Sequence, residues 1–332
     1  MKPSVLKEAI KSALDAKLSV FIWGQPGCGK SSIVYQISEA LGKKLHEMRA
    51  LLYEPIDVRG FPVVKDGVTS YCPPEELPKE KNSLLFVDEL NQAPMMTQNA
   101  FLQLVIPPHK LGTYTLPSDC GIIAAGNRET DRAGATRMGT ALANRFVHMS
   151  FEIDTEEWLD WAIAENIAPE IYAFIRYRSE LLSTFDKTKS EKAFASPRSY
   201  EFLSKLITCG KLFDLSKATQ IETITGTIGE GAATEFIAFV DIWQSLPNPD
   251  EVLAKPNDFS VDGMKPNVLY ALCGAIARKA NVKNESNFFT FAKNLPGEWS
   301  IRLIHDATKM EPKLKQTKGY IDWASKFAKY MI

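Results

Sequence analysis

The chain has 332 residues, which is long enough for two domains and a large buried core. Its 45% hydrophobic and 24% charged residues are typical of a soluble globular protein, and its formal net charge of -1 excludes a global basic field for nucleic acid or anionic lipid. No apolar run is long enough to span a bilayer and the first residues do not form a signal peptide, so we expect a cytoplasmic protein with no membrane partner.

The chain begins with an alternation of helical and strand-like segments. Apolar spacings of three and four predict a helix over 5–16, and the apolar run 18–23 predicts a strand. A second helical pattern covers 31–41 and ends at Gly42. Between this strand and this helix, residues 24–31 read Gly-Gln-Pro-Gly-Cys-Gly-Lys-Ser and fit the phosphate-binding pattern G-x-x-x-x-G-K-[ST].

This loop has the chemistry that binds phosphate. Its glycines let backbone N–H groups converge on phosphate oxygens, Lys30 can reach the outer phosphates, and Ser31 can ligate Mg²⁺. A glycine-rich turn with a surface lysine is the alternative, and the preceding strand argues against it. The predicted nucleotide-binding residues are Gly24, Pro26, Gly27, Cys28, Gly29, Lys30, Ser31 and Ser32.

A pair of acids follows the next clear strand. A weaker strand over 45–51 and a hairpin over 60–72, with an Asp-Gly turn, precede the buried apolar run 83–87. That run ends in Asp88 and Glu89, where unpaired charges would be costly. A helix cap or a surface salt bridge is one explanation. We favour another, in which Asp88 holds Mg²⁺ and Glu89 polarises the attacking water.

An amide ends the third buried strand. The sequence predicts a helix over 95–105, a second hairpin within 109–118 and a strand over 121–126 that leads to Asn127. An asparagine at this position can simply cap a turn. In an α/β sheet, however, ligands gather at the carboxyl ends of strands, so Asn127 can also meet a γ-phosphate or the attacking water.

The remaining pattern is mostly helical. A short helix over 136–144 leads to Arg145, and 147–151 is the last predicted strand. Helical patterns follow, and Ser196-Pro197 predicts a helix start that places Arg198 in the first turn. A cation there opposes the helix dipole and points to an anionic partner, although a surface salt bridge is an alternative.

The five cysteines are scattered, with no C-x-x-C pair, which disfavours a disulfide framework or a zinc site. Cys28 lies at a predicted helix N-terminus, where thiols tend to have a lowered pKa and to react with alkylating agents. A simple packing role in the loop is the more economical interpretation.

Together these motifs make residues 5–240 resemble the AAA+ ATPases, specifically the MoxR-like branch. The resemblance identifies 24–31 as Walker A, 84–89 as Walker B and Asn127 as sensor 1. It further implies that Arg145 is the trans-acting arginine finger and Arg198 the sensor-2 arginine of the lid. Arg132 and Arg137 compete with Arg145 for the finger role, because 128–140 is richer in arginine and glycine than the family pattern.

The resemblance also implies an architecture and an assembly. The expected fold is an α/β P-loop NTPase: an αβα sandwich with a parallel five-stranded sheet over 1–152, an all-helical lid over 153–246 and a small helical C-terminal region over 247–332. The hairpins near 60–72 and 109–118 match inserts of that branch. ATP and Mg²⁺ are the expected cofactors, and a trans finger implies a head-to-tail ring, for which the family expectation is a homohexamer.

Three functions remain open at this stage. The first is an ATP-driven machine that remodels a protein client, with a von Willebrand factor A domain protein as its implied partner. The second is a nucleic-acid motor with Lys65, His109 and Lys110 facing a pore, although the near-neutral charge means that nucleic acid is not expected. The third is a nucleotide-gated scaffold, which would have no need of Glu89. The residues alone do not separate ATP from GTP, and they do not identify the client.

Overall fold

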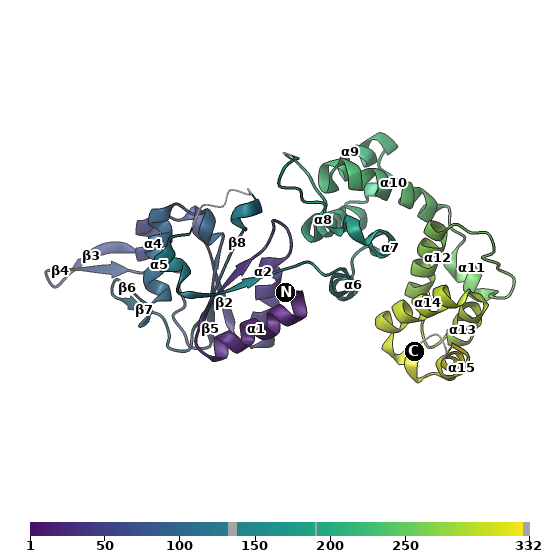
Figure 1. The fold of residues 1–332 in the computed structure, drawn as a ribbon, viewed down its shortest axis with the longest axis horizontal. Helices are drawn as coiled ribbons and strands as arrows, with labels where there is room; N and C mark the ends of the chain where they lie inside the picture. Colours follow the sequence, from purple (N-terminus) through teal and green to yellow (C-terminus); the bar gives the residue numbers. More distant parts are fainter. Residues whose placement is uncertain (132–137, 190, 328–332) are drawn as a thin grey trace. The chain divides into compact units, whose positions relative to one another are not determined.

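The structure is a computed structural model that describes residues 1–131, 138–189 and 191–327. The chain separates into two compact units, which are described one at a time (Figure 1). The first unit comprises Met1–Asp154 and Phe185–Ser190, and the second comprises Thr155–Thr184 and Glu191–Ile332.

A parallel sheet forms the centre of the first unit. Its strands follow the order β2-β5-β8-β1-β9, and every neighbouring pair is parallel. The predicted five-stranded parallel sheet is therefore confirmed. The strands are β1 (Ser19–Trp23), β2 (Lys44–Arg49), β5 (Ser83–Asp88), β8 (Gly121–Gly126) and β9 (Phe146–Ser150).

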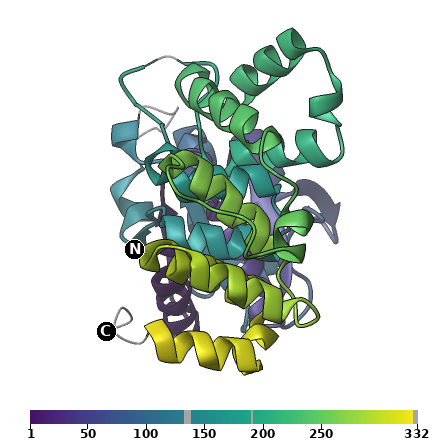
Figure 2. The ribbon, with the colours of Figure 1, turned by 90° about the vertical axis from the view of Figure 1, so that its right-hand side faces the viewer.

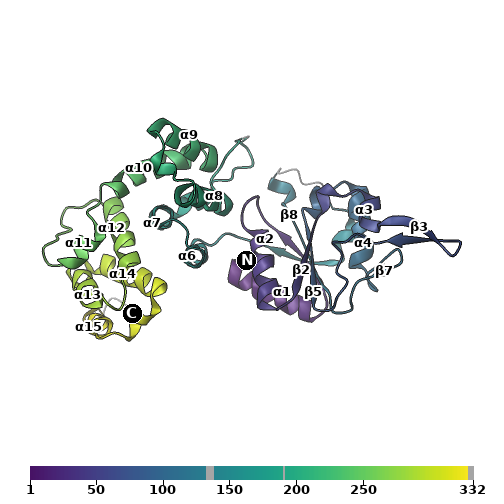
Figure 3. The same ribbon diagram turned by 180° about the vertical axis from the view of Figure 1, so that it is seen from behind.

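Alternating side chains bury both faces of this sheet. In β5, Leu84 and Phe86 belong to the apolar core that also contains residues of α1 and α2, whereas Leu85 and Val87 belong to the core that contains residues of α4. Since successive strand residues point to opposite faces, one apolar run supplies two cores and the sheet lies between helical layers (Figure 3). The helices are α1 (Pro3–Asp15), α2 (Lys30–Ala40), α3 (Pro55–Arg59), α4 (Met95–Val105) and α5 (Thr140–Ala143).

Two hairpins extend from this unit. Strands β3 (Phe61–Lys65) and β4 (Val68–Cys72) are antiparallel, and the ribbon shows them reaching away from the sheet (Figure 3). Their turn has positive φ at Asp66 (51°) and Gly67 (73°), the backbone that an Asp-Gly pair supports. The second hairpin joins β6 (Lys110–Leu111) to β7 (Tyr114–Thr115).

The described part of the second unit is helical (Figure 2), which confirms the predicted helical lid and C-terminal region. Gly229, where φ is 81°, separates the helix Lys217–Ile228 from the helix Glu230–Gln244. None of the described helices is long and apolar enough to cross a membrane. The helices are α6 (Thr155–Ala164), α7 (Pro169–Tyr177), α8 (Pro197–Thr208), α9 (Lys217–Ile228), α10 (Glu230–Gln244), α11 (Pro249–Ala254), α12 (Pro266–Lys279), α13 (Glu285–Asn294), α14 (Gly297–Met310) and α15 (Lys318–Phe327).

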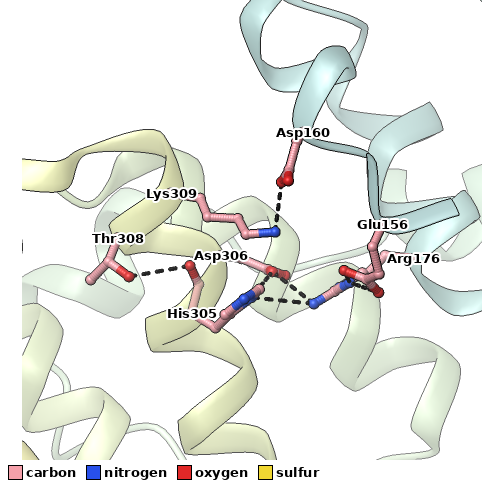
Figure 4. Close-up of polar contacts among 7 residues, drawn as sticks. All are labelled: Glu156, Asp160, Arg176, His305, Asp306, Thr308 and Lys309. Atoms are coloured by element: carbon pink, nitrogen blue, oxygen red, sulfur yellow. Dashed lines mark hydrogen bonds and ion pairs between the residues drawn. The ribbon is translucent and has the colours of Figure 1, made fainter. Parts of the chain in front are cut away.

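Charged side chains connect α6, α7 and α14 within this unit (Figure 4). The guanidinium of Arg176 lies 2.5 Å from Glu156 and 3.2 Å from Asp306, and Lys309 donates to Asp160 at 2.6 Å. Asp306 is only 4% exposed, and Arg176 is its partner in a largely buried ion pair. We call these five residues the Arg176–Asp306 cluster. It joins the start of the predicted lid to the predicted C-terminal region, and the division of the two at 246/247 stays a prediction.

Candidate nucleotide-binding site

The loop after β1 has the backbone of a phosphate cradle. Gly27 and Gly29 have φ values of 72° and 103°, which residues with a Cβ rarely adopt. Gly29 is the N-cap of α2 and has no side chain to cap it. Because the first N–H groups of a helix have no partner within the helix, this end of α2 suits an anion.

Lys30 connects the loop to the neighbouring strand β8. Its ammonium group donates to the carbonyl oxygens of Gly24 (2.8 Å) and Gln25 (3.1 Å) and to Oδ1 of Asn127 (2.9 Å). The structure therefore brings the predicted phosphate-binding lysine and the predicted sensor amide into direct contact.

A second direct contact joins the loop to β5. The Ser31 hydroxyl donates to Oδ2 of Asp88 at 2.8 Å, while Oδ1 of Asp88 accepts from the backbone N–H of Glu89 at 2.9 Å. Glu89 has φ of 57°, a left-handed backbone that costs a residue with a side chain about 1–2 kcal/mol. This strained conformation lies next to the Ser31–Asp88 contact, at the position where we expect a catalytic carboxylate.

Asn91 is a buried residue of this site that the sequence analysis did not identify. Its amide donates to the backbone oxygen of Asn127 at 2.8 Å, and a Cβ on Gly126 would lie 1.9 Å from its Oδ1. Asn91 thus fixes the end of β8 that carries the Asn127 side chain. No local pattern marks it, because its partner lies 36 residues further along the chain.

The family comparison covers this part of the chain. Residues 19–146 match the model of the AAA domain, dynein-related subfamily. This segment is an AAA domain. The match spans less than half of the chain, and it includes the phosphate loop, the Asp88–Glu89 pair, Asn127 and Arg145.

Solved structures with a similar arrangement have low sequence identity. NtrX from Brucella abortus in complex with ADP is 16% identical over 94% of this chain and 67% of that chain, with a TM-score of 0.40. A mutant of RuvB from Thermotoga maritima is 14% identical over 85% of this chain and 82% of that chain, with a TM-score of 0.41. No curated protein matches the sequence.

The structure describes two of the four predicted arginines, Arg145 and Arg198. Arg145 is an exposed residue of the AAA domain that precedes β9 and donates to the carbonyl oxygen of Ala141 in α5. Arg198 is exposed in the first turn of α8, in the second unit. Arg132 and Arg137 fall outside the described residues. The roles of these arginines remain predictions.

Cys28 is a packing residue of the AAA domain. Its side chain is 4% exposed, and burial raises the pKa of the thiol although Lys30 and Arg128 act in the opposite direction. The lowered pKa that thiols tend to have at a helix N-terminus is therefore not found for Cys28. A Cβ on Gly24 would come within 2.8 Å of the Cys28 sulfur, so the Cys28 side chain fits only beside a residue without a Cβ.

A polar group from α2 and β2 lies near the acids of β5 and was also missed. Arg49 is paired in register with Asp88 across the β2–β5 ladder, and its Nε donates to Glu47 at 3.3 Å. Tyr35 donates to the same carboxylate, and that hydrogen bond, with burial, raises the pKa of Tyr35 to about 12. These residues are visible only once β2 is placed beside β5.

The AAA domain offers hard oxygen ligands for Mg²⁺ at the contact between Ser31 and Asp88. A hydroxyl and a carboxylate held 2.8 Å apart are the protein ligands that Mg²⁺ takes alongside substrate phosphates and water. Within the described ranges, no group of three or more His, Cys, Asp or Glu side chains could hold a metal ion. A site with few protein ligands agrees with a metal that is bound together with a nucleotide.

Proposed function

We propose that this protein hydrolyses ATP at the AAA domain. The observation that carries the proposal is the pair of direct contacts, Lys30 to Asn127 and Ser31 to Asp88, which unite residues of the loop and two strands at one edge of the sheet. In this proposal the ammonium group of Lys30 moves from the carbonyl oxygens to the outer phosphates. Asn127 then contacts the γ-phosphate or the attacking water.

Ser31 and Asp88 would hold Mg²⁺, which when bound neutralises charge on the β- and γ-phosphates. Glu89 would accept a proton from the attacking water, because its carboxylate follows the metal-binding Asp88 directly. We expect the phosphoryl group to pass to water and not to a second substrate, because the Asp88–Glu89 pair together with Asn127 suits hydrolysis. The choice of ATP over GTP rests on the resemblance to AAA+ ATPases.

We further propose that subunits assemble head to tail, so that Arg145 of one subunit reaches the nucleotide of the next. A finger supplied in this way stabilises the charge on the transferring phosphoryl group. Head-to-tail contacts can close into a ring, for which we propose a homohexamer. The exposed position of Arg145 is compatible with this role. Arg198 would contact the same nucleotide from the helical lid.

The proposed task is that of a MoxR-type remodelling ATPase in the cytoplasm, acting with a von Willebrand factor A domain partner. The hairpin β3–β4 supports a protein client, because one of its faces exposes apolar side chains: Phe61 is 68% exposed, Val63 45% and Val68 64%. Exposed apolar groups that lie close together commonly mark sites of protein contact. DNA that stimulates hydrolysis at low salt would favour the nucleic-acid alternative instead.

The test is phosphate release by the purified protein and by Glu89→Gln, with ATP binding measured in parallel. Loss of the general base should lower kcat by roughly 10²–10⁴ and leave the Kd for ATP unchanged. Glu75→Gln, which alters an exposed acid of the same unit, is the matched control and should hydrolyse normally. Wild-type rates in Glu89→Gln would overturn the assignment, and a wild-type protein without ATPase activity would overturn the function.

A further inference from the structure

The residue that precedes the phosphate loop is hydrogen-bonded to a histidine. Trp23 ends β1, and its indole nitrogen lies 2.9 Å from Nδ1 of His148 in β9. The two rings are also stacked, with centroids 5.8 Å apart and an angle of 25° between their planes. An indole N–H can only donate, so Nδ1 of His148 must accept and carries no proton.

The other nitrogen of this imidazole reaches the corner of the AAA domain that carries Arg145. Nε2 of His148 lies 2.8 Å from the carbonyl oxygen of Ala143, the last residue of α5. Since Nδ1 accepts, the proton is on Nε2 and is donated to that carbonyl. The neutral imidazole therefore satisfies Trp23 on one side and α5 on the other.

Helix α5 depends on such contacts because it has only four residues. Its carbonyl groups at Ala141 and Ala143 are bound by side chains of Arg145 and His148, respectively. Arg145 follows α5 by two positions. The orientation of this short turn, which His148 holds, consequently determines where Arg145 is presented.

We propose that His148 is a positioning residue for ATP hydrolysis, which holds α5 in place for Arg145 through its hydrogen bonds to Trp23 and Ala143. This inference rests on the proposed function, in which Arg145 acts on the neighbouring subunit's nucleotide. Loss of both hydrogen bonds lowers turnover, because α5 and Arg145 are then no longer held in one position.

The contacts of His148 are with aromatic rings and one carbonyl group. They are the ring of Trp23, the rings of Phe21 and Phe146, and the Ala143 carbonyl group. One imidazole ring therefore connects the end of β1, which leads into the phosphate loop, to α5.

The test compares ATP turnover in two variants. His148→Gln keeps one acceptor for Trp23 and one donor for Ala143, whereas His148→Phe keeps a ring and loses both hydrogen bonds. The kcat of His148→Phe should fall about 2- to 10-fold, the size of one lost neutral hydrogen bond, while the kcat of His148→Gln should stay close to the wild-type value. KM should stay unchanged in both variants.

A third variant sharpens the result. Trp23→Phe should lower kcat less than His148→Phe does, because His148 still donates to the Ala143 carbonyl group. Normal turnover in His148→Phe, or an equal loss in His148→Gln, would overturn the positioning role while ATP hydrolysis stands. An inactive wild-type protein would overturn the proposed function and this role with it.

Discussion

The AAA domain and the helical unit each contain a group of polar side chains, and the two groups are built differently. In the AAA domain, Lys30 and Ser31 donate to neutral carbonyl and amide oxygens and to one half-buried carboxylate. In the helical unit, the Arg176–Asp306 cluster pairs opposite charges, and the central acid, Asp306, is 4% exposed. A phosphate and a metal ion can replace the first set of contacts, but water cannot easily replace the second.

This difference separates binding from stability. Burial works against the charge of Arg176, yet Asp306 and Glu156 together raise the pKa of its guanidinium above the usual value. Removing one member of such a pair leaves a buried charge without a partner. Changes in the Arg176–Asp306 cluster should therefore lower stability, whereas changes at Lys30 or Ser31 should weaken nucleotide binding and leave the fold intact.

Asp306→Ala is expected to have the largest effect. Loss of one partner of a buried ion pair costs about 3–5 kcal/mol, so the free energy of unfolding of the helical unit should fall by that amount. Denaturant unfolding followed by far-UV circular dichroism measures it, and Asp160→Ala, whose pair with Lys309 is exposed, should cost less than about 1 kcal/mol. Equal costs in the two variants would contradict the importance of burial within this cluster.

Lys30→Ala should show the opposite behaviour. Charge-assisted hydrogen bonds to phosphate are worth about 1.5–3 kcal/mol, so the affinity for ATP should fall at least about 10- to 100-fold. The free energy of unfolding should change by less than about 1 kcal/mol, because water can hydrogen-bond to the oxygens of Gly24, Gln25 and Asn127 when the ammonium group is absent. Lys43→Ala, which removes a lysine bonded to the backbone oxygen of Asp119 in the same unit, is the control for calorimetric titration; normal affinity in Lys30→Ala would refute the site.

Glu170→Gln should have the smallest effect. Burial raises the pKa of Glu170 above its ordinary value of 4.5, and Arg278 only partly opposes this. The folded protein therefore binds this proton more tightly than the unfolded chain, so stability decreases as the pH rises from about 4.5 toward neutrality. The amide should raise the free energy of unfolding by about 0.5 kcal/mol at pH 7 and by almost nothing at pH 4, and a uniform effect at both pH values would contradict the assignment.

The sequence predicted those parts of the molecule that local patterns determine. The buried runs that end at Asp88 and Asn127 predicted strands of a parallel sheet, and the Asp66-Gly67 turn predicted a hairpin. Lys30, Ser31, Asp88 and Asn127 were assigned to one site because strand ends meet at one edge of a sheet. Their contacts follow from that topology.

Contacts between distant segments could not be predicted in this way. Asn91 is an ordinary amide until β8 lies beside it, and Trp23 and His148 are 125 residues apart. Arg176 and Asp306 lie on separate helices with no motif around either. For Cys28 the sequence left two interpretations open, and the burial of the thiol, which depends on packing, decides in favour of the packing role.

The central claim is that each ATP site is shared between two subunits, and mixing two inactive variants tests it most directly. Glu89→Gln retains Arg145, and Arg145→Ala retains Glu89; each variant alone should lose at least about 10²-fold in ATP turnover. Equal mixing should restore activity at about a quarter of the interfaces of a head-to-tail ring. Mixed rings that contain both variants and still hydrolyse no more ATP than either variant alone would contradict the shared site.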